Sequence, residues 1–95
     1  MTILSARSQR QLDSARLDVT KLANDTSFNM TMRWLARDAV AKGYRYQVAI
    51  MADYYAHEMA QRSTMEEMKD IWIERAGLYF NLAKEFQQRP GISTP

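Results

Sequence analysis

The sequence contains no cysteine, one histidine, three glycines and two prolines in 95 residues. Without cysteine, the chain forms no disulfide, no cysteine-ligated metal centre and no thiol nucleophile. The three glycines, Gly43, Gly77 and Gly91, lie too far apart for a phosphate-binding loop of the GxGxxG or GxxxxGK type. These scarcities exclude several classes of nucleotide-dependent and nucleophilic enzymes.

Long apolar runs and charge of one sign are also scarce. The longest uninterrupted apolar run, 48–52, is far shorter than the roughly 20 residues that a membrane-spanning helix needs. The formal net charge is only +2, although residues 1–47 carry eight basic and four acidic side chains while residues 48–95 carry five and seven. We therefore expect a cytoplasmic protein that does not associate with membranes.

The apolar fraction, 46%, is that of an ordinary globular chain. Apolar residues recur every three or four positions, which is typical of amphipathic helices. This spacing predicts an all-α fold, a small four-helix bundle with a long C-terminal antiparallel helical hairpin. We expect a single helical domain over 1–90 with helices at about 8–23, 28–42, 45–62 and 65–88, followed by a disordered tail at 91–95.

Two helix boundaries have clear local signals. Gly43 suits the left-handed residue that ends many helices, although a bend within one long helix is the alternative. Ser63 and Thr64 each precede a glutamate by three positions, Glu66 and Glu67, and both pairs match the capping box that begins a helix.

The first and last helices differ in their apolar stripes. The stripe of the first helix is thin, so we expect this helix to be only weakly attached; it consists of Leu12, Ala15, Val19 and Leu22. The last helix has a longer core stripe, formed by Met65, Met68, Trp72, Ala76, Tyr79, Ala83 and Phe86.

Apolar side chains also lie outside these stripes. In the third helix Tyr46, Ile50 and Tyr54 recur every four residues on a second face, and Ile73 and Phe80 share a flank of the fourth helix. Either several contacts within the monomer bury this surplus, or the surplus contacts another chain. We expect the second, because large exposed apolar patches on soluble proteins usually mark interfaces.

These five residues are therefore the predicted partner-binding site. The sequence favours a non-enzymatic protein-interaction module, such as a regulatory subunit, adaptor or inhibitor, that self-associates as a homodimer. No catalytic residue, cofactor or metal site is expected.

Two polar groupings are candidate sites. Asp53 and His57 are four residues apart on a helix, where a carboxylate can orient an imidazole for catalysis or metal binding. A hydrogen-bonded structural histidine is the commoner role. The acidic set Glu66, Glu67, Asp70 and Glu74 suits a weak divalent cation site, but such a run is more often a solvated helix face.

Nucleic-acid binding is the alternative function. The basic residues of the second helix and the turn after it are suited to contact phosphates: Arg33, Arg37, Lys42 and Arg45. Arg7, Arg10 and Arg16 of the first helix offer a second basic group. The third helix argues against base recognition, because Tyr46, Ile50 and Tyr54 stand where a recognition helix presents polar side chains.

Overall fold

The computed structural model describes residues 4–87, and these fold into four α-helices joined by short turns. The helices are α1 (Ala6–Asn24), α2 (Met30–Lys42), α3 (Arg45–Arg62) and α4 (Glu66–Gln87). No strand occurs within this range. The predicted all-α bundle is confirmed, whereas the end of the predicted fourth helix at Gln88 and the predicted tail at 91–95 lie outside the described residues.

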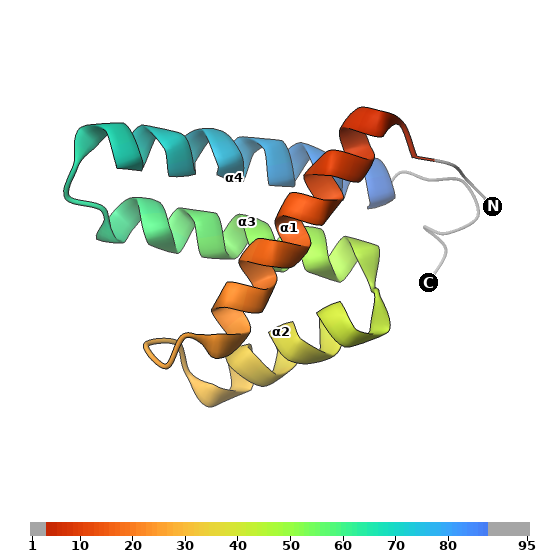
Figure 1. Cartoon of the computed structure of the whole chain (residues 1–95), viewed down its shortest axis with the longest axis horizontal. Coiled ribbons are helices and arrows are strands. Elements are labelled where there is room, and N and C mark those ends of the chain that lie inside the picture. Colours follow the sequence, from red (N-terminus) through yellow and green to blue (C-terminus); the bar gives the residue numbers. More distant parts are fainter. Residues whose placement is uncertain (1–3, 88–95) are drawn as a thin grey trace.

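The predicted C-terminal hairpin is formed by α3 and α4, which run antiparallel along the length of the molecule (Figure 1). Alanines line much of the seam between them and are nearly fully buried: Ala49, Ala52, Ala56 and Ala76. Small side chains let the two helix backbones approach closely. An edge contact between Tyr55 and Trp72, with ring centroids 5.7 Å apart, sets the register of the pair.

The turn between α3 and α4 differs in detail from the expected capping box. The Ser63 hydroxyl donates to the carbonyl of Met59 at 2.7 Å, so this side chain closes the end of α3. The backbone amide of Ser63 donates to the same carbonyl at 3.0 Å, so Ser63 closes the C-terminus of α3, where the sequence pattern placed it at a helix N-terminus.

Helix α1 crosses the hairpin and also contacts α2 (Figure 1). The four residues of its thin apolar stripe are each at most 1% exposed. The expectation that this helix is weakly attached is therefore wrong. A narrow stripe suffices because α1 lies between α2 and the hairpin, so one row of side chains is covered from several sides.

The crossing of α1 also explains an error in the predicted stripe of α4. Met65 and Met68 are 59% and 42% exposed, while Leu82, placed outside the stripe, is 1% exposed. The side-chain hydrogen bonds from α1 to α4 join Asp18, Ser14 and Ser8 to residues from Arg75 onward. The first turns of α4 extend beyond α1 and have only α3 beside them.

Polar side chains organise the turn before α2 and the start of this helix. Before it, the Asp25 carboxylate accepts hydrogen bonds from the hydroxyl and amide of Ser27, and these lower the pKa of Asp25. The Asn29 side chain then caps the helix by accepting from the amide of Met32.

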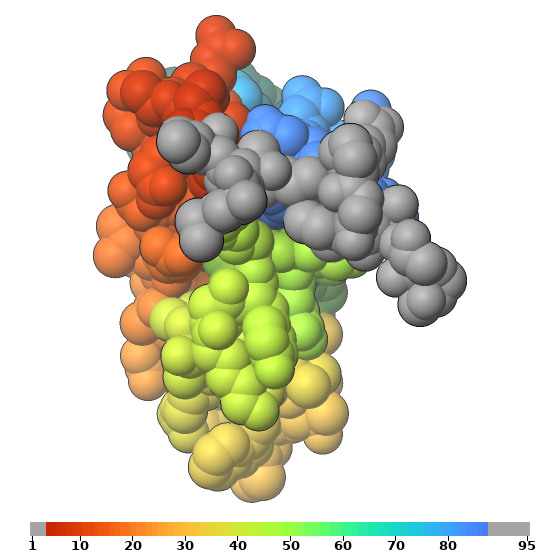
Figure 2. Space-filling model, turned by 90° about the vertical axis from the view of Figure 1, so that its right-hand side faces the viewer, coloured from red at the N-terminus to blue at the C-terminus, as the bar shows by residue number. Residues whose placement is uncertain are grey.

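Helix α2 ends at Gly43, which has φ of +70°. The predicted helix end is therefore confirmed, and the alternative of one long bent helix is wrong. The exposed turn that follows lies at the centre of one end of the molecule, between α1 (orange) and α2 (yellow) in Figure 2.

Candidate interaction surface

The predicted partner-binding residues of α3 are all exposed on the folded chain. Tyr46 and Ile50 are each 41% exposed and Tyr54 is 38% exposed. Their four-residue spacing places them on the outer side of α3, because the opposite side carries the fully buried Val48 and Ala52. The monomer core therefore does not cover this face of α3.

The two predicted residues of α4 are more exposed still, with Ile73 at 55% and Phe80 at 52%. Ile71 and Leu78, two positions before each of them, line the groove between α4 and α1. Two residues correspond to a rotation of about 200° around a helix. Ile73 and Phe80 consequently lie on the flank of α4 that faces away from α1.

The register of the hairpin shows which exposed residues of α3 lie level with those of α4. Because Tyr55 is level with Trp72 in an antiparallel pair, Ile50 is level with Gly77, and Tyr54 is level with Ile73. The exposed residues of α3 and α4 thus span the same length of the hairpin. We call Tyr46, Ile50, Ile73, Gly77 and Phe80 the outer face.

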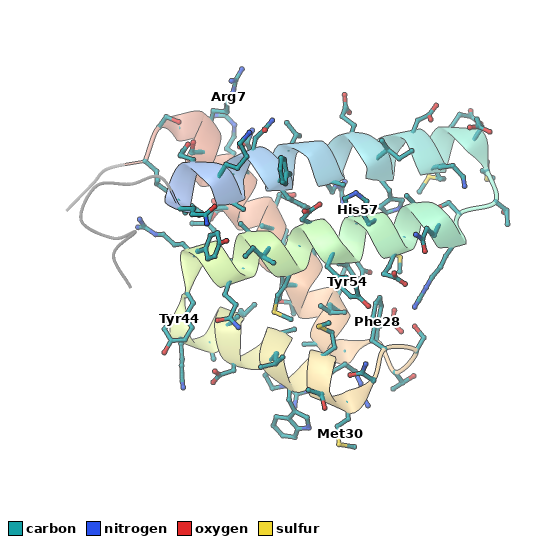
Figure 3. The ribbon with its side chains drawn as sticks, turned by 180° about the vertical axis from the view of Figure 1, so that it is seen from behind. Arg7, Phe28, Met30, Tyr44, Tyr54 and His57 are labelled. Carbon is teal, nitrogen blue, oxygen red and sulfur yellow. The ribbon has the colours of Figure 1, made fainter. Side chains whose placement is uncertain are left out.

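Tyr54 differs from the other four predicted residues. Its ring makes an edge contact with Phe28, with centroids 6.0 Å apart, and both lie on the α2 side of α3 in Figure 3. Phe28 is 5% exposed and packs against Tyr55 as well. Tyr54 therefore belongs partly to the packing of the α1–α2 turn, at the margin of the outer face.

The basic residues of the nucleic-acid alternative mostly have partners within the chain. The Arg33 Nε donates to the carbonyl of Phe28 at 3.1 Å, and the Arg37 guanidinium stacks on Trp34. Lys42 pairs with Asp38 at 3.3 Å. Arg45 is half-buried at the start of α3.

Arg7 of α1 and Arg33 of α2 do not lie close together. Arg7 lies near the start of α1, whereas Phe28, whose carbonyl accepts from Arg33, lies beyond its opposite end (Figure 3). A helix of 19 residues is about 28 Å long, so Arg7 and Arg33 lie near opposite ends of α1.

A buried polar network between α1 and α4 was not predicted from the sequence. The Asp18 carboxylate, 1% exposed, accepts a hydrogen bond from the Tyr79 hydroxyl at 2.6 Å. The Arg75 guanidinium lies 3.3 Å from the same carboxylate oxygen. Since the single phenolic proton goes to Asp18, Ser14 donates to the Tyr79 oxygen at 2.8 Å. The sequence carries no clear signal for it, because Asp18 lies at the edge of the apolar stripe of α1, where exposed polar residues are common.

Above this network lies an open groove of about 370 Å³ between α1 and α4. Arg7, Arg10 and Arg75 line it together with Ile71 and Leu78. The Arg75 guanidinium is held by Asp18 and by the ring of Trp72, 4.6 Å from its centroid. The groove thus combines cationic and apolar walls, but its floor hydroxyls are engaged in the network.

The remaining polar candidates have ordinary structural environments. The His57 Nδ1 lies 3.0 Å from the backbone carbonyl of Asp53 and 2.9 Å from its carboxylate. Burial raises the pKa of Asp53. Between residues 4 and 87, no group of three or more histidine, aspartate or glutamate side chains is arranged to hold a metal ion.

None of the helices in the described part of the chain has the length and apolarity needed to cross a membrane. No protein-family model, no curated protein and no solved structure matches this chain.

Proposed function

We propose that this protein is a non-enzymatic interaction module that binds other protein chains, including its own copy, through the outer face of α3 and α4. One observation carries the proposal. The four large side chains of the outer face are 41–55% exposed, although a complete apolar core exists elsewhere in the same helices.

The chemistry of this face is that of an interface. Aromatic and aliphatic side chains dominate it, and tyrosine and phenylalanine are enriched at the centres of protein interfaces. Water contact with so much apolar surface is unfavourable by about 25 cal/mol for each Å². A partner that covers the outer face removes this cost, which favours association.

A role without catalysis agrees with how the polar groups are used. Ser14, Asp18 and Tyr79 bond to one another, and Arg75 is held between Asp18 and Trp72. A catalytic site needs polar groups that converge on a substrate. We place the module in the cytoplasm as a small regulatory subunit, adaptor or inhibitor.

Self-association is tested by light scattering on a size-exclusion column. The wild-type chain is expected at twice the 11.1 kDa of one copy at micromolar concentration. Phe80→Glu is expected to weaken the dimer at least about tenfold, because it buries a charge at the interface. Phe80 is preferred to Tyr54 for this test because Tyr54 also packs on Phe28.

Leu17→Glu is the matched control. Leu17 is 66% exposed on α1, so the same substitution is made at an apolar surface residue outside the outer face. We expect the control to leave the dimer intact. A wild-type chain that elutes as a monomer, or a control that dissociates the dimer as strongly as Phe80→Glu, would contradict the proposal.

A further inference from the structure

Gly77 lies at the middle of α4 on the exposed outer face, and the monomer gives no reason for a glycine there. A Cβ atom built at this position meets nothing within 4 Å. Glycine inside a helix costs about 1 kcal/mol relative to alanine. Its advantage is that another backbone can approach closely. A glycine with open space above it therefore suits contact with a second helix.

The side chains on either side of Gly77 form a self-complementary pattern. Ile73 lies four positions before it and Phe80 three positions after it. Asp70 and Lys84 lie seven positions before and after, which places opposite charges about 10.5 Å from Gly77 in each direction. Seven residues are nearly two full turns, so Asp70, Gly77 and Lys84 share one line along the helix. All five residues are exposed.

The two charges have no opposite charge beside them within the described residues. Asp70 takes part in no ion pair there, and the Lys84 ammonium lies 5.2 Å from the centroid of the Phe80 ring without a carboxylate near it. Both charges are thus available to a partner, at the two ends of the same apolar segment.

We propose that two copies of this chain associate through α4 in antiparallel orientation, with the two helices crossing at Gly77. The inference rests on the proposed function and specifies its self-association. A two-fold axis through Gly77 brings each residue opposite the one at equal distance on the other side of Gly77. Asp70 then faces Lys84 of the partner subunit. Ile73 is one position farther from Gly77 than Phe80 is, so it lies about 1.5 Å along the helix axis from Phe80 of the partner subunit and can pack against it.

Charge selects this arrangement over a parallel one. In a parallel pair with the same crossing point, Asp70 meets a second aspartate and Lys84 meets a second lysine, which is repulsive at both ends. The antiparallel pair has two attractive contacts in their place. An unrelated partner would not require that the opposite charges stand at equal distances from the glycine, whereas a second copy does.

Charge reversal tests the register. Asp70→Lys places two lysines opposite each other at both ends of the interface, and Lys84→Asp does the same with two aspartates. Each exposed charge contact changes an equilibrium constant by a factor of about 2 to 3. With two attractions lost and two repulsions gained, either variant is expected to raise the dimer dissociation constant roughly thirtyfold.

Two combinations are expected to restore association. The double variant Asp70→Lys/Lys84→Asp again has opposite charges across the two-fold axis. An equimolar mixture of the two single variants forms a heterodimer in which all facing charges are opposite, which native mass spectrometry detects by mass. The dissociation constants of both pairs are expected to return to within about threefold of the wild-type value. Asp38→Lys, on the exposed surface of α2, is the control: it removes the ion pair with Lys42 but should leave the dimer dissociation constant unchanged.

The outcomes separate this inference from the proposed function. A wild-type monomer overturns both. A wild-type dimer that Phe80→Glu dissociates but Asp70→Lys leaves unchanged overturns only the antiparallel register. The antiparallel register is also overturned if both single variants dissociate but neither the double variant nor the mixture restores the dimer.

Discussion

At the scale of single residues, the buried carboxylate of Asp18 has the largest unfavourable cost of burial. A carboxylate without water is unfavourable unless hydrogen bonds replace its hydration. Here the Tyr79 hydroxyl, 2.6 Å away, and the Arg75 guanidinium, 3.3 Å away, both contact it. Because Asp18 belongs to α1 while its two partners belong to α4, the network fixes how α1 crosses the hairpin.

Removal of the phenolic hydroxyl is expected to weaken the fold. Tyr79→Phe leaves the ring in place but deprives the Asp18 carboxylate of a hydrogen bond, at a cost of about 1–3 kcal/mol at pH 7. Urea unfolding measures this cost. Tyr44→Phe, at a tyrosine that is 49% exposed, is the control and should change the free energy of unfolding by less than about 0.5 kcal/mol.

The loss of stability in Tyr79→Phe is expected to depend on pH. Burial, followed by the hydrogen bond to Asp18, raises the pKa of Tyr79 above its ordinary value of 10.0. The unfolded chain ionises this phenol near pH 10 while the folded chain keeps it neutral, so its contribution to stability is complete below pH 10 and falls above it. The difference between wild type and Tyr79→Phe should therefore shrink as pH rises past 10. A difference that stays constant to pH 11 would contradict this account.

The network also shows a limit of sequence reasoning. Asp18 stands among Ala15, Val19 and Leu22, where it resembles an exposed polar residue at the edge of a stripe. Its partners are 57 and 61 positions away. Local periodicity contains no information about which distant side chain meets it, so the burial of Asp18 could not be predicted.

At the scale of elements, two glycines have opposite roles and provide a matched pair of substitutions. Gly43 ends α2 with φ of +70°, a conformation that strains other residues, whereas Gly77 lies inside α4 with open space beside it. We expect Gly43→Ala to destabilise the chain by about 1 kcal/mol and Gly77→Ala to stabilise the monomer by a similar amount.

Thermal unfolding measures both effects in the Phe80→Glu background, where the proposed dimer is weakened. Each kcal/mol corresponds to a shift of about 4–8 °C in Tm for a domain of this size. If Gly43→Ala and Gly77→Ala shifted Tm in the same direction, the opposite roles of the two glycines would be contradicted. In the otherwise wild-type chain, Gly77→Ala should in addition weaken the dimer, since its methyl group keeps the two α4 helices apart.

The helices themselves were largely predictable, because their signals are local. Both ends of α3 and the end of α2 match the expected positions, while both ends of α1 and the starts of α2 and α4 differ by one or two residues. The burial of particular faces was less predictable. Met65 and Met68 fit the α4 stripe by spacing alone, yet the partner helix that would cover them lies farther along α4.

At the scale of the whole molecule, α1 is a central helix of the fold. Like α3, it contacts all three other helices, while α2 does not contact α4. The core thus lies around α1, and the hairpin contributes only one side of each of its helices to it. This arrangement leaves the outer face exposed.

The central place of α1 predicts the pattern of amide hydrogen exchange. Amides whose helix is buried in the core open only when the whole domain unfolds, whereas peripheral segments open locally. We expect amides from Leu12 to Leu22 to exchange as slowly as those at the centre of α3, and the first turns of α4 to exchange faster. The result is measured by mass spectrometry or NMR on the Phe80→Glu variant, so that dimer contacts do not add protection.

A weakly attached first helix would give the opposite result. Its amides would then exchange well before those of α3, with an opening free energy several kcal/mol below that of global unfolding. Val19→Ala provides an independent measure, since Val19 is fully buried at the middle of α1. If α1 is central, the substitution lowers the free energy of unfolding by about 2 kcal/mol and accelerates exchange in α1, α3 and the later turns of α4 alike, because all of them unfold together.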